Sequence, residues 1–303
     1  MSLPAEPTVS PATLRDLYIE LMKKCVTHSL WFDKEINVSF AERPPALAKW
    51  ALNVLHTVRV RLGLSHHGAL AKWAFRTPLI RPYLNKPEVM IERKMQGNMW
   101  PEFAHTMIGF PRLNNLESAV RSVVEEDIPG DLIEAGVWRG GACIFMRAIL
   151  KAYGVTNRSV WVADSFQGLP PPNLERAPLD KGLNLYQHSE LAVSLETVQS
   201  HFQAYGLLDD QVKFLKGWFK DTLPTAPIQK LAVCRLDGDL YESTMDGLVS
   251  LYPKLAVGGY LIIDDYGAIS SCKQAVHDYR DQHGITEPLQ TIDWSGVYWR
   301  KQG

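Results

Sequence analysis

Long apolar runs are missing from this chain, although 46% of its 303 residues are hydrophobic. No run reaches the roughly 18–20 apolar residues of a transmembrane helix. The N-terminal residues also lack the basic start and apolar block of a secretory signal. We therefore expect a cytoplasmic protein without a transmembrane segment. The length suffices for one large α/β domain or two smaller domains.

Cysteine is scarce as well. The four cysteines, Cys25, Cys143, Cys234 and Cys272, are widely spaced, and Cys143 and Cys234 lie in apolar surroundings. This distribution favours buried free thiols in a reducing compartment over disulfides or a zinc site.

Acidic residues are absent between Arg43 and Lys86, where eight lysines and arginines occur. Since the whole chain carries −1, the remainder carries −9, which argues against a general nucleic-acid binder. The basic segment 43–86 predicts an acidic partner or surface, such as a carrier protein or an anionic membrane face. The alternative, which we favour, is a solvated or dimer-forming element.

Helical periodicity is present near the N-terminus. Ser10 and Pro11 form a capping signal, and apolar residues then recur at helical spacing from Leu14 to Cys25. A second amphipathic stretch covers residues 47–58. We expect residues 1–100 to form a helical N-terminal region that precedes a domain at 101–303.

From about Gly130 the pattern changes to an alternation of strands and helices, which predicts a mostly parallel sheet with helices on both faces. Ligands of such sheets bind beyond the carboxyl ends of the strands. The predicted strands are 131–135, 159–163, 212–215, 231–236, 259–263, 289–292 and 296–300, and the predicted helices are 141–153, 191–205, 241–255 and 272–282.

Five carboxylates follow these strands: Asp164, Asp237, Asp239, Asp264 and Asp265. A bare buried carboxylate is very costly, so they indicate a site for a cofactor and a hard metal ion. Asp237, Asp264 and Asp265 offer only oxygen, which favours Mg²⁺, Ca²⁺ or Mn²⁺ over zinc. Successive strand residues point to opposite faces, so Asp264 and Asp265 need not converge. Without a cation, converging carboxylates would raise one another's pKa.

Asp239 lies two residues beyond Asp237 and is the candidate base. An aliphatic alcohol is a poor nucleophile at neutral pH, and a positioned carboxylate can take its proton. The alternative role of Asp239 is a helix cap, with Glu242 at capping-box spacing.

The first predicted strand leads into a glycine-rich turn that contains Glu134, Gly136 and Trp138. Trp138 stands where a dinucleotide fingerprint has its second glycine, and Glu134 would repel a phosphate. A cationic sulfonium ligand suits this turn better, which favours S-adenosylmethionine over NAD. Asp164, 28 residues beyond Gly136, is a candidate for binding the ribose hydroxyls. The alternatives are a plain turn and an aspartate that caps the next loop.

Together these motifs resemble the macrocin O-methyltransferase family, the metal-dependent sugar O-methyltransferases of antibiotic pathways. The resemblance runs from about Phe103 to the C-terminus and includes the helix near residues 14–31. Its most specific part is the Asp237 motif followed by the Asp-Asp pair. The matching stretches are 104–109, 134–141, 163–170, 217–219, 236–244 and 263–267.

The resemblance implies a class I S-adenosylmethionine-dependent methyltransferase fold: α/β, Rossmann-like, with a mostly parallel seven-stranded sheet between helices and a helical N-terminal extension. It also implies Mg²⁺ and a homodimer. Residues 42–100 depart from the family because they form a longer link than usual. Since the N-terminal segment normally helps to shape the acceptor pocket, the resemblance does not define the choice of substrate.

Site residues follow from the resemblance position by position. Asp237, Asp264 and Asp265 would hold the metal, and Asp239 would be the base. His188, in a polar loop at 186–189, would lie over the substrate as a second catalytic residue, or else be a solvated histidine. The cofactor would contact Thr106, Met107, Ile108, Glu134, Gly136, Val137, Asp164, Ser165, Gly217, Trp218, Phe219 and Asp237. Ordinary core packing is the alternative for Trp218 and Phe219.

The implied activity is Mg²⁺-dependent methylation, by S-adenosylmethionine, of a sugar hydroxyl on a small glycosylated natural product. One alternative keeps the fold and metal but accepts a catechol-like phenol, which ionises more readily. A second alternative is a non-catalytic scaffold protein, which the complete set of aspartates argues against. An NAD dehydrogenase is disfavoured by Trp138.

Overall fold

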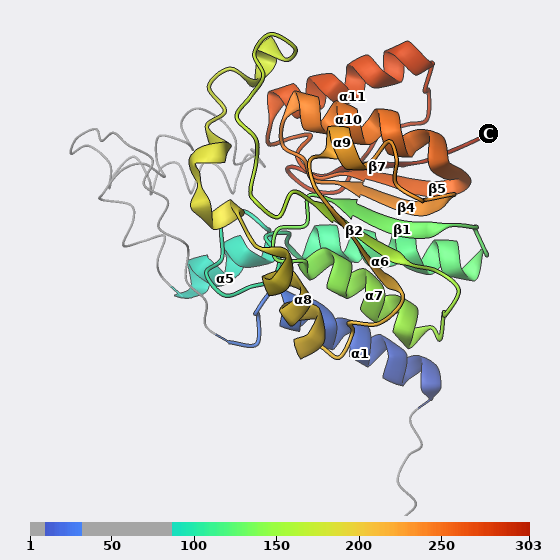
Figure 1. Cartoon of the computed structure of the whole chain (residues 1–303). Coiled ribbons are helices and arrows are strands. Elements are labelled where there is room, and N and C mark those ends of the chain that lie inside the picture. The colour runs from blue at the N-terminus through green and yellow to red at the C-terminus, as the bar shows by residue number, and fades with distance from the viewer. Residues whose placement is uncertain (1–9, 32–86) are drawn as a thin grey trace, which may run out of the picture.

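The computed structural model describes residues 10–31 and 87–303 (Figure 1). These residues contain a seven-stranded sheet in the order β3-β2-β1-β4-β5-β7-β6. All neighbouring strands pair in parallel except β7, which is antiparallel to both β5 and β6. The predicted α/β fold is confirmed. The strands are β1 (Asp131–Ala135), β2 (Val160–Asp164), β3 (Val212–Lys216), β4 (Leu231–Leu236), β5 (Leu255–Ile263), β6 (Gln290–Thr291) and β7 (Val297–Arg300).

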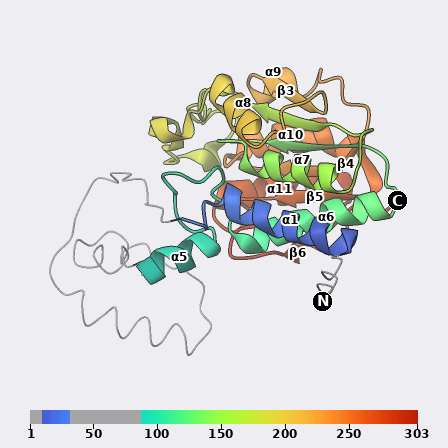
Figure 2. The same ribbon diagram turned by 90° about the horizontal axis from the view of Figure 1, so that it is seen from below.

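Helices cover both faces of the sheet, as Figures 1 and 2 show. Alternate strand residues enter two different cores, because side chains along a strand alternate between faces. Leu132, Val233 and Ile262 pack with one set of helices: α1 (Pro11–Val26), α6 (Phe110–Glu125), α7 (Gly141–Ala152) and α8 (Leu195–Ala204). Ile133, Cys234 and Leu261 pack on the opposite face, which carries α9 (Phe219–Thr222), α10 (Tyr241–Leu251) and α11 (Ser270–His283).

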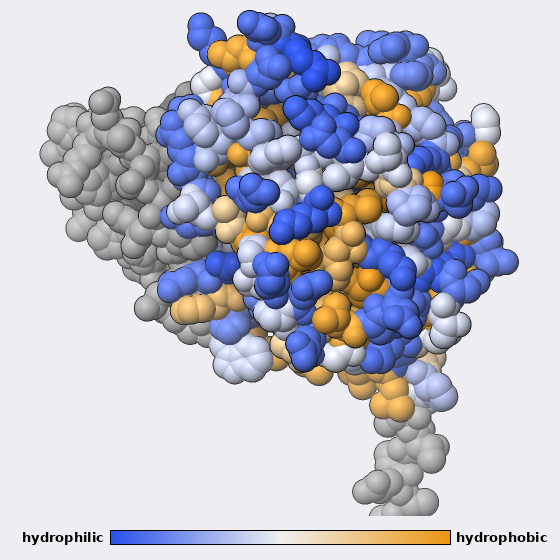
Figure 3. Space-filling model, viewed as in Figure 1, coloured by the Kyte–Doolittle hydropathy of each residue, from blue (hydrophilic) through white to orange (hydrophobic). Residues whose placement is uncertain are grey.

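The N-terminal helix α1 forms as predicted. Ser10 caps it by accepting the backbone N–H of Thr13 at 3.2 Å. Ile19, Met22 and Val26 are buried in the core that α6 and α7 share. The other half of the apolar stripe is exposed: Leu14, Leu17 and Leu21 are 56%, 59% and 48% accessible. Figure 3 shows apolar surface in this region among hydrophilic residues.

Several boundaries differ from the prediction for local reasons. The helix expected at 191–205 begins at Leu195, because Ser194 caps it by accepting the N–H of Thr197. The helix expected at 241–255 ends at Leu251 and is followed by a 3₁₀ turn, η4 (Tyr252–Lys254), around Pro253. Helix α6 has no counterpart among the predicted elements. Helix α5 (Pro87–Met95) precedes it, and three short 3₁₀ turns, η1 (Pro178–Asp180), η2 (Leu185–Gln187) and η3 (Ser189–Leu191), lie between β2 and α8.

The predictions for the amphipathic stretch 47–58 and the basic segment 43–86 fall outside the described residues. The division into a helical region at 1–100 and a domain at 101–303 stays a prediction. Of the N-terminal region, α1 packs into the same core as α6 and α7. Within 10–31 and 87–303, no helix is long and apolar enough to cross a membrane. The four cysteines lie in this part and are free thiols, and Cys143 and Cys234 are buried as predicted.

Candidate active site at the carboxyl ends of the strands

The predicted aspartates gather at one edge of the sheet. Asp164 ends β2, Asp237 follows β4, and Asp264 and Asp265 follow β5. Because Leu236 and Ile263 are register partners, the chain leaves β4 and β5 side by side, so Asp237 and Asp264 are neighbours. Side-chain direction then decides which of these residues meet.

Three carboxylates converge here: Asp237, Asp239 and Asp265, hereafter the acidic group. One oxygen from each lies within 4.8 Å of the others, in the part of the chain that the structure describes. The backbone N–H of Asp239 donates to Oδ2 of Asp265 at 3.1 Å. Asp239 has φ +60°, a left-handed conformation that aspartate tolerates better than most residues. This turn carries the chain back across the end of β5.

Desolvation and repulsion from neighbouring carboxylates raise the pKa of every member of the acidic group, and at Asp237 the neighbour is Asp264. Desolvation is the largest cause for each. The charges of Asp237 and Asp264 add to it at Asp239, and those of Asp239, Asp237 and Asp264 add to it at Asp265. At Asp237 the Arg235 guanidinium acts in the opposite direction. Carboxylates in this situation favour a bound cation.

Asp264, a predicted metal ligand, has different partners from Asp265. Its Oδ2 accepts from Nη1 of Arg112 at 2.5 Å, and its Oδ1 accepts from Nη2 of Arg235. The cause is strand alternation: Asp264 follows Ile262 on the α6 and α7 face, whereas Asp265 turns toward Asp239. The structure therefore brings Asp239 into the acidic group where Asp264 was expected. The metal assignment of Asp264 stays a prediction.

Glu134, predicted to contact the cofactor, is 2% exposed and bound within the protein. Its carboxylate accepts from Arg235 and, at 3.0 Å, from the thiol of Cys143. Burial raises the pKa of Glu134 to about 7, although the positive charge of Arg235 opposes the shift. Its predicted contact with the cofactor stays a prediction.

The glycine-rich turn between β1 and α7 uses three left-handed residues, Gly136 (φ +92°), Trp138 (φ +47°) and Gly140 (φ +84°). A Cβ on Gly136 would lie 1.8 Å from the carbonyl oxygen of Asp237. Only glycine therefore fits where the turn passes the end of β4. The indole N–H of Trp138 donates to the carbonyl of Glu190 at 2.9 Å, which ties the turn to η3.

Asp164 bonds this turn to the end of β2. Its carboxylate accepts the backbone N–H of Val137 and that of Phe166, each at 2.8 Å. Ser165 donates to the carbonyl of Gly168 at 2.7 Å. The hydroxyl of Ser165 also donates to Oδ1 of Asp164 at 3.4 Å. Asp164 thus caps its loop, and its contact with a ribose stays a prediction.

The segment with Thr106, Met107 and Ile108 packs against the start of α7. The carbonyl of His105 accepts the N–H of Gly141 at 2.9 Å. Arg139 donates to the carbonyls of Glu102 and Ala104 at 2.8 and 2.9 Å. Thr106 and Ile108 are buried and Met107 is half-buried. This segment therefore borders the glycine-rich turn, where the predicted lid would have to lie.

Two further predictions concern loops. The N–H of Gly217 donates to the carbonyl of Asp164 at 2.9 Å, and a Cβ on Gly238 would lie 3.4 Å from the Phe219 ring. Residues 217–219 thus join the end of β2 to the loop of the acidic group. His188 is half-buried, with its ring edge-on to Trp100 at a centroid distance of 5.3 Å. Its catalytic role stays a prediction.

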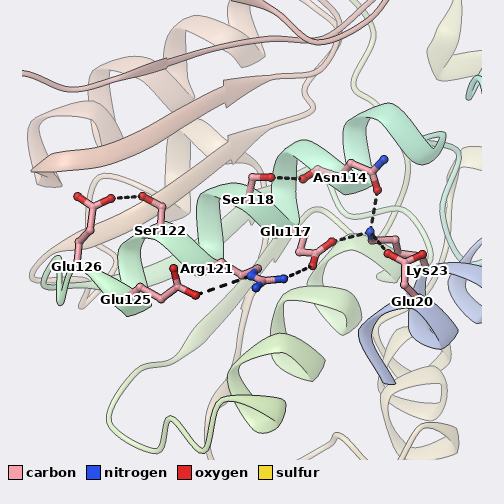
Figure 4. A pocket seen from close by; sticks show the side chains of 9 residues that line it. All are labelled: Glu20, Lys23, Asn114, Glu117, Ser118, Arg121, Ser122, Glu125 and Glu126. Atoms are coloured by element: carbon pink, nitrogen blue, oxygen red, sulfur yellow. Dashed lines mark hydrogen bonds and ion pairs between the residues drawn. The ribbon is translucent and has the colours of Figure 1, made fainter. Parts of the chain in front are cut away.

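A separate polar pocket of about 530 Å³ lies along α1 and α6 (Figure 4). Lys23, only 3% exposed, donates there to Glu20 and Asn114 at 2.5 and 2.7 Å and pairs with Glu117 at 2.5 Å. Arg121 also pairs with Glu117. These charges bind one another, so the pocket joins the two helices and is distinct from the strand-end site.

Sequence reasoning missed Arg235 and Arg112, which bind the carboxylates from the α6 and α7 side of the sheet. Arg235 had a signal, because a charged residue within the apolar strand Leu231–Leu236 must be paired. Arg112 had none, since α6 was not predicted and its partner Asp264 lies far along the chain.

Comparisons with known proteins identify the family of this chain. The family model Macrocin-O-methyltransferase (TylF) matches residues 15–301. A mycinamicin III 3''-O-methyltransferase of Micromonospora griseorubida is 57% identical over 213 residues, which is 69% of this chain and 84% of the relative.

A second relative, the 8-demethyl-8-(2,3-dimethoxy-alpha-L-rhamnosyl)-tetracenomycin-C 4'-O-methyltransferase of Streptomyces olivaceus, is 52% identical over 232 residues. This match covers 76% of this chain and 88% of the relative. The solved structure of the O-methyltransferase NovP is 42% identical, with a TM-score of 0.77, over 95% of this chain and 100% of its own.

This chain belongs to the macrocin O-methyltransferase family, as the resemblance predicted. It is an O-methyltransferase with the class I fold, and S-adenosylmethionine is its methyl donor. The matches cover a larger share of both curated relatives than of this chain, so this chain is longer than either.

Proposed function

We propose that this family member methylates a sugar hydroxyl of a small glycosylated natural product in a reaction that depends on Mg²⁺. The acidic group beside the glycine-rich turn carries the proposal, because it offers oxygen ligands next to a cofactor loop. The name of the Streptomyces olivaceus relative includes a dimethoxy-rhamnosyl group, which supports a sugar as acceptor.

The donor set fits a hard divalent cation. Asp237, Asp239 and Asp265 contribute carboxylate oxygens within 4.8 Å, and a cation would relieve the repulsion that raises their pKa. When bound, Mg²⁺ would lower the pKa of an acceptor hydroxyl beside it. Asp264 already has an arginine on each of its oxygens, which makes it the less accessible ligand. Asp237, Asp239 and Asp265 are therefore our first choice, and Asp264 is the fourth candidate.

The cofactor residues surround the glycine-rich turn. We assign Gly136 and Val137 to the backbone approach, Asp164 and Ser165 to the ribose, and the predicted lid, Thr106, Met107 and Ile108, to a cover. Gly217, Trp218 and Phe219 would border the adenine. Glu134 would act through Arg235 rather than by direct contact, because it is 2% exposed and already binds Arg235 and Cys143. S-adenosylmethionine supplies a methyl group activated by its sulfonium charge.

Asp239 stays the candidate base. A carboxylate has two oxygens, so one can face the cation while the other accepts the proton of the acceptor hydroxyl. His188 is the second candidate catalytic residue, from the loop between β2 and α8. The remaining contribution of the protein is to hold both reactants in line, which can supply a large part of the rate enhancement.

Further proposals rest on the sequence and on the resemblance to the family. Residues 1–100 would shape the acceptor pocket, and the enzyme would be a cytoplasmic homodimer. The basic segment 43–86 would either bind an acidic partner or face solvent at the dimer. Size-exclusion chromatography with light scattering tests the dimer directly.

A methyl-transfer assay tests the main proposal. The enzyme would be incubated with S-adenosylmethionine and a panel of rhamnosylated polyketides, their aglycones and a catechol, with Mg²⁺ or with excess EDTA. We expect a methylated glycoside in Mg²⁺ and none in EDTA, detected by mass spectrometry. Full turnover in EDTA would refute the metal dependence, and turnover of catechol alone would refute the sugar acceptor.

A further inference from the structure

A buried arginine lies beneath the acidic group. Arg235 is 1% exposed, and its guanidinium binds carboxylates from three neighbouring strand ends. Nη1 donates to Glu134 and, at 2.8 Å, to Oδ2 of Asp237, while Nη2 donates to Asp264. One side chain thus joins β1, β4 and β5 where they reach the site.

The register of the sheet explains this convergence. Glu134 pairs with Arg235, and Arg235 pairs with Ile262, so all three lie on the face covered by α6 and α7. Asp237 and Asp264 come two residues after Arg235 and Ile262 and therefore return to that face. A planar guanidinium with five N–H donors can bind several carboxylates in fixed directions, which a lysine ammonium cannot do.

A second buried arginine approaches from α6. Arg112 is 5% exposed, and its Nη1 binds Oδ2 of Asp264 at 2.5 Å. Its Nε binds Asp293 at 3.0 Å, and its Nη2 donates to the carbonyl of Gly97 at 2.7 Å. Each oxygen of Asp264 therefore has its own arginine. Arg112 also connects the site to the residues after α5 and to the turn between β6 and β7.

We propose that Arg235 and Arg112 are positioning residues for metal binding: Arg235 orients the carboxylate of Asp237 for the cation, and Arg112 holds Asp264 in place against Arg235. This inference rests on the proposed Mg²⁺ dependence. Arg235 acts on Asp237 directly, and Arg112 acts through Asp264, whose two oxygens the arginines share.

A purely structural role for Arg235 would not explain why it binds Asp237. The Asp237 side chain is 28% exposed and water could solvate it, yet its Oδ2 is held by Arg235. This bond fixes the rotation of a carboxylate whose remaining oxygen is available to a ligand. Partners that orient metal ligands in this way typically change metal affinity by about 10–100-fold when they are replaced.

Lysine substitutions test the inference, because lysine keeps the positive charge but lacks the planar guanidinium that binds several carboxylates in fixed directions. The full-length Arg235→Lys and Arg112→Lys proteins would be titrated by calorimetry with Mg²⁺ and, separately, with S-adenosylhomocysteine. Arg147→Lys is the matched control, since Arg147 is also 5% exposed and binds Asp209 twice, at 3.0 and 2.6 Å, outside the site. Thermal unfolding of each variant reports its stability.

We expect Arg235→Lys and Arg112→Lys to weaken Mg²⁺ binding by about 10–100-fold. Affinity for S-adenosylhomocysteine should stay at the wild-type level, and Arg147→Lys should bind Mg²⁺ normally. Normal Mg²⁺ affinity in both site variants, or an equal loss in Arg147→Lys, would overturn the inference. If Arg235→Lys does not fold, Arg112→Lys decides. Absence of Mg²⁺ binding by the wild-type protein would overturn the metal dependence itself, and this inference with it.

Discussion

The substitution Gly136→Ala tests how closely the cofactor turn and the metal site depend on each other. In the structure a Cβ at this position lies 1.8 Å from the carbonyl oxygen of Asp237, whereas ordinary contacts begin at 3.4 Å. The two atoms must therefore separate by about 1.6 Å, the difference of those distances. Since the N–H of Asp237 donates to the carbonyl of Ala135 at 2.8 Å, the displacement strains the backbone on both strands.

Two costs add in this variant. A left-handed φ costs a residue with a Cβ about 1–2 kcal/mol, and overpacking typically costs about 1–3 kcal/mol more. Gly154→Ala separates them, because Gly154 also has a positive φ, +68°, but nothing within 4 Å of its Cβ position. We therefore expect a loss of about 2–5 kcal/mol in unfolding free energy for Gly136→Ala and about 1–2 kcal/mol for Gly154→Ala.

The functional effect should be larger than the stability effect. A misplacement of about 1 Å can reduce a rate by roughly 100-fold, so Gly136→Ala should lower kcat/KM by at least about that factor and weaken binding of both S-adenosylhomocysteine and Mg²⁺. Urea unfolding, calorimetry and the methyl-transfer assay measure the three quantities. If Gly136→Ala and Gly154→Ala give the same ligand affinities and turnover, the proposed contact between the turn and Asp237 does not matter for function.

Three other predictions concern the site and its surroundings. Asp237→Ala should abolish turnover while S-adenosylhomocysteine still binds, and full activity would exclude Asp237 as a metal ligand. Asp239→Asn should weaken Mg²⁺ binding more than Asp264→Asn does, and the reverse order would restore Asp264 as the third ligand. Burial, together with nearby His201 and Arg139, lowers the pKa of His105 to about 4, below its ordinary 6.5. The buried neutral imidazole of His105 therefore contributes fully to the free energy of unfolding above about pH 6.5. This contribution is lost as pH falls toward 4, and the loss is about 2 kcal/mol after allowance for partial exposure. Urea unfolding should show a smaller loss between pH 7.5 and 4.5 for His105→Gln than for the wild type, and an equal loss in the two proteins would refute this contribution.

Much of the fold could be predicted because the relevant signals are local. The change from helical periodicity to short apolar runs after Gly130 located the parallel strands, and the aspartates after those runs located the edge where they meet. Helix α6 was missed although Leu113, Leu116, Val120 and Val123 have helical spacing. Arg112 was missed with it, and its contact with Asp264 depends on how the helix lies on the sheet.

The side-chain partners of the site could not be predicted from the motifs, because they depend on which face of the sheet each residue occupies. Asp264 and Asp265 are adjacent in sequence and alike in chemistry. Strand alternation nevertheless sends Asp264 toward Arg112 and Arg235, and Asp265 toward Asp239. The motif identifies the carboxylates of the site as a set. The alternation of side chains along the strand decides which of them bind arginines and which join the acidic group.

This division bears on why the site tolerates so much negative charge. Glu134 and Asp264 lie on the face where Arg235 pairs with both of them and Arg112 pairs with Asp264, so these ion pairs offset part of the cost of their burial. Asp239 and Asp265 lie on the other side with no arginine among the ion pairs of the described residues, and Asp237 lies between the two sets with one oxygen on Arg235. Asp239 and Asp265 are therefore the part of the cluster that the described ion pairs leave uncompensated. A cation would complete that part, and the arginines would keep the rest of the carboxylates from competing for it.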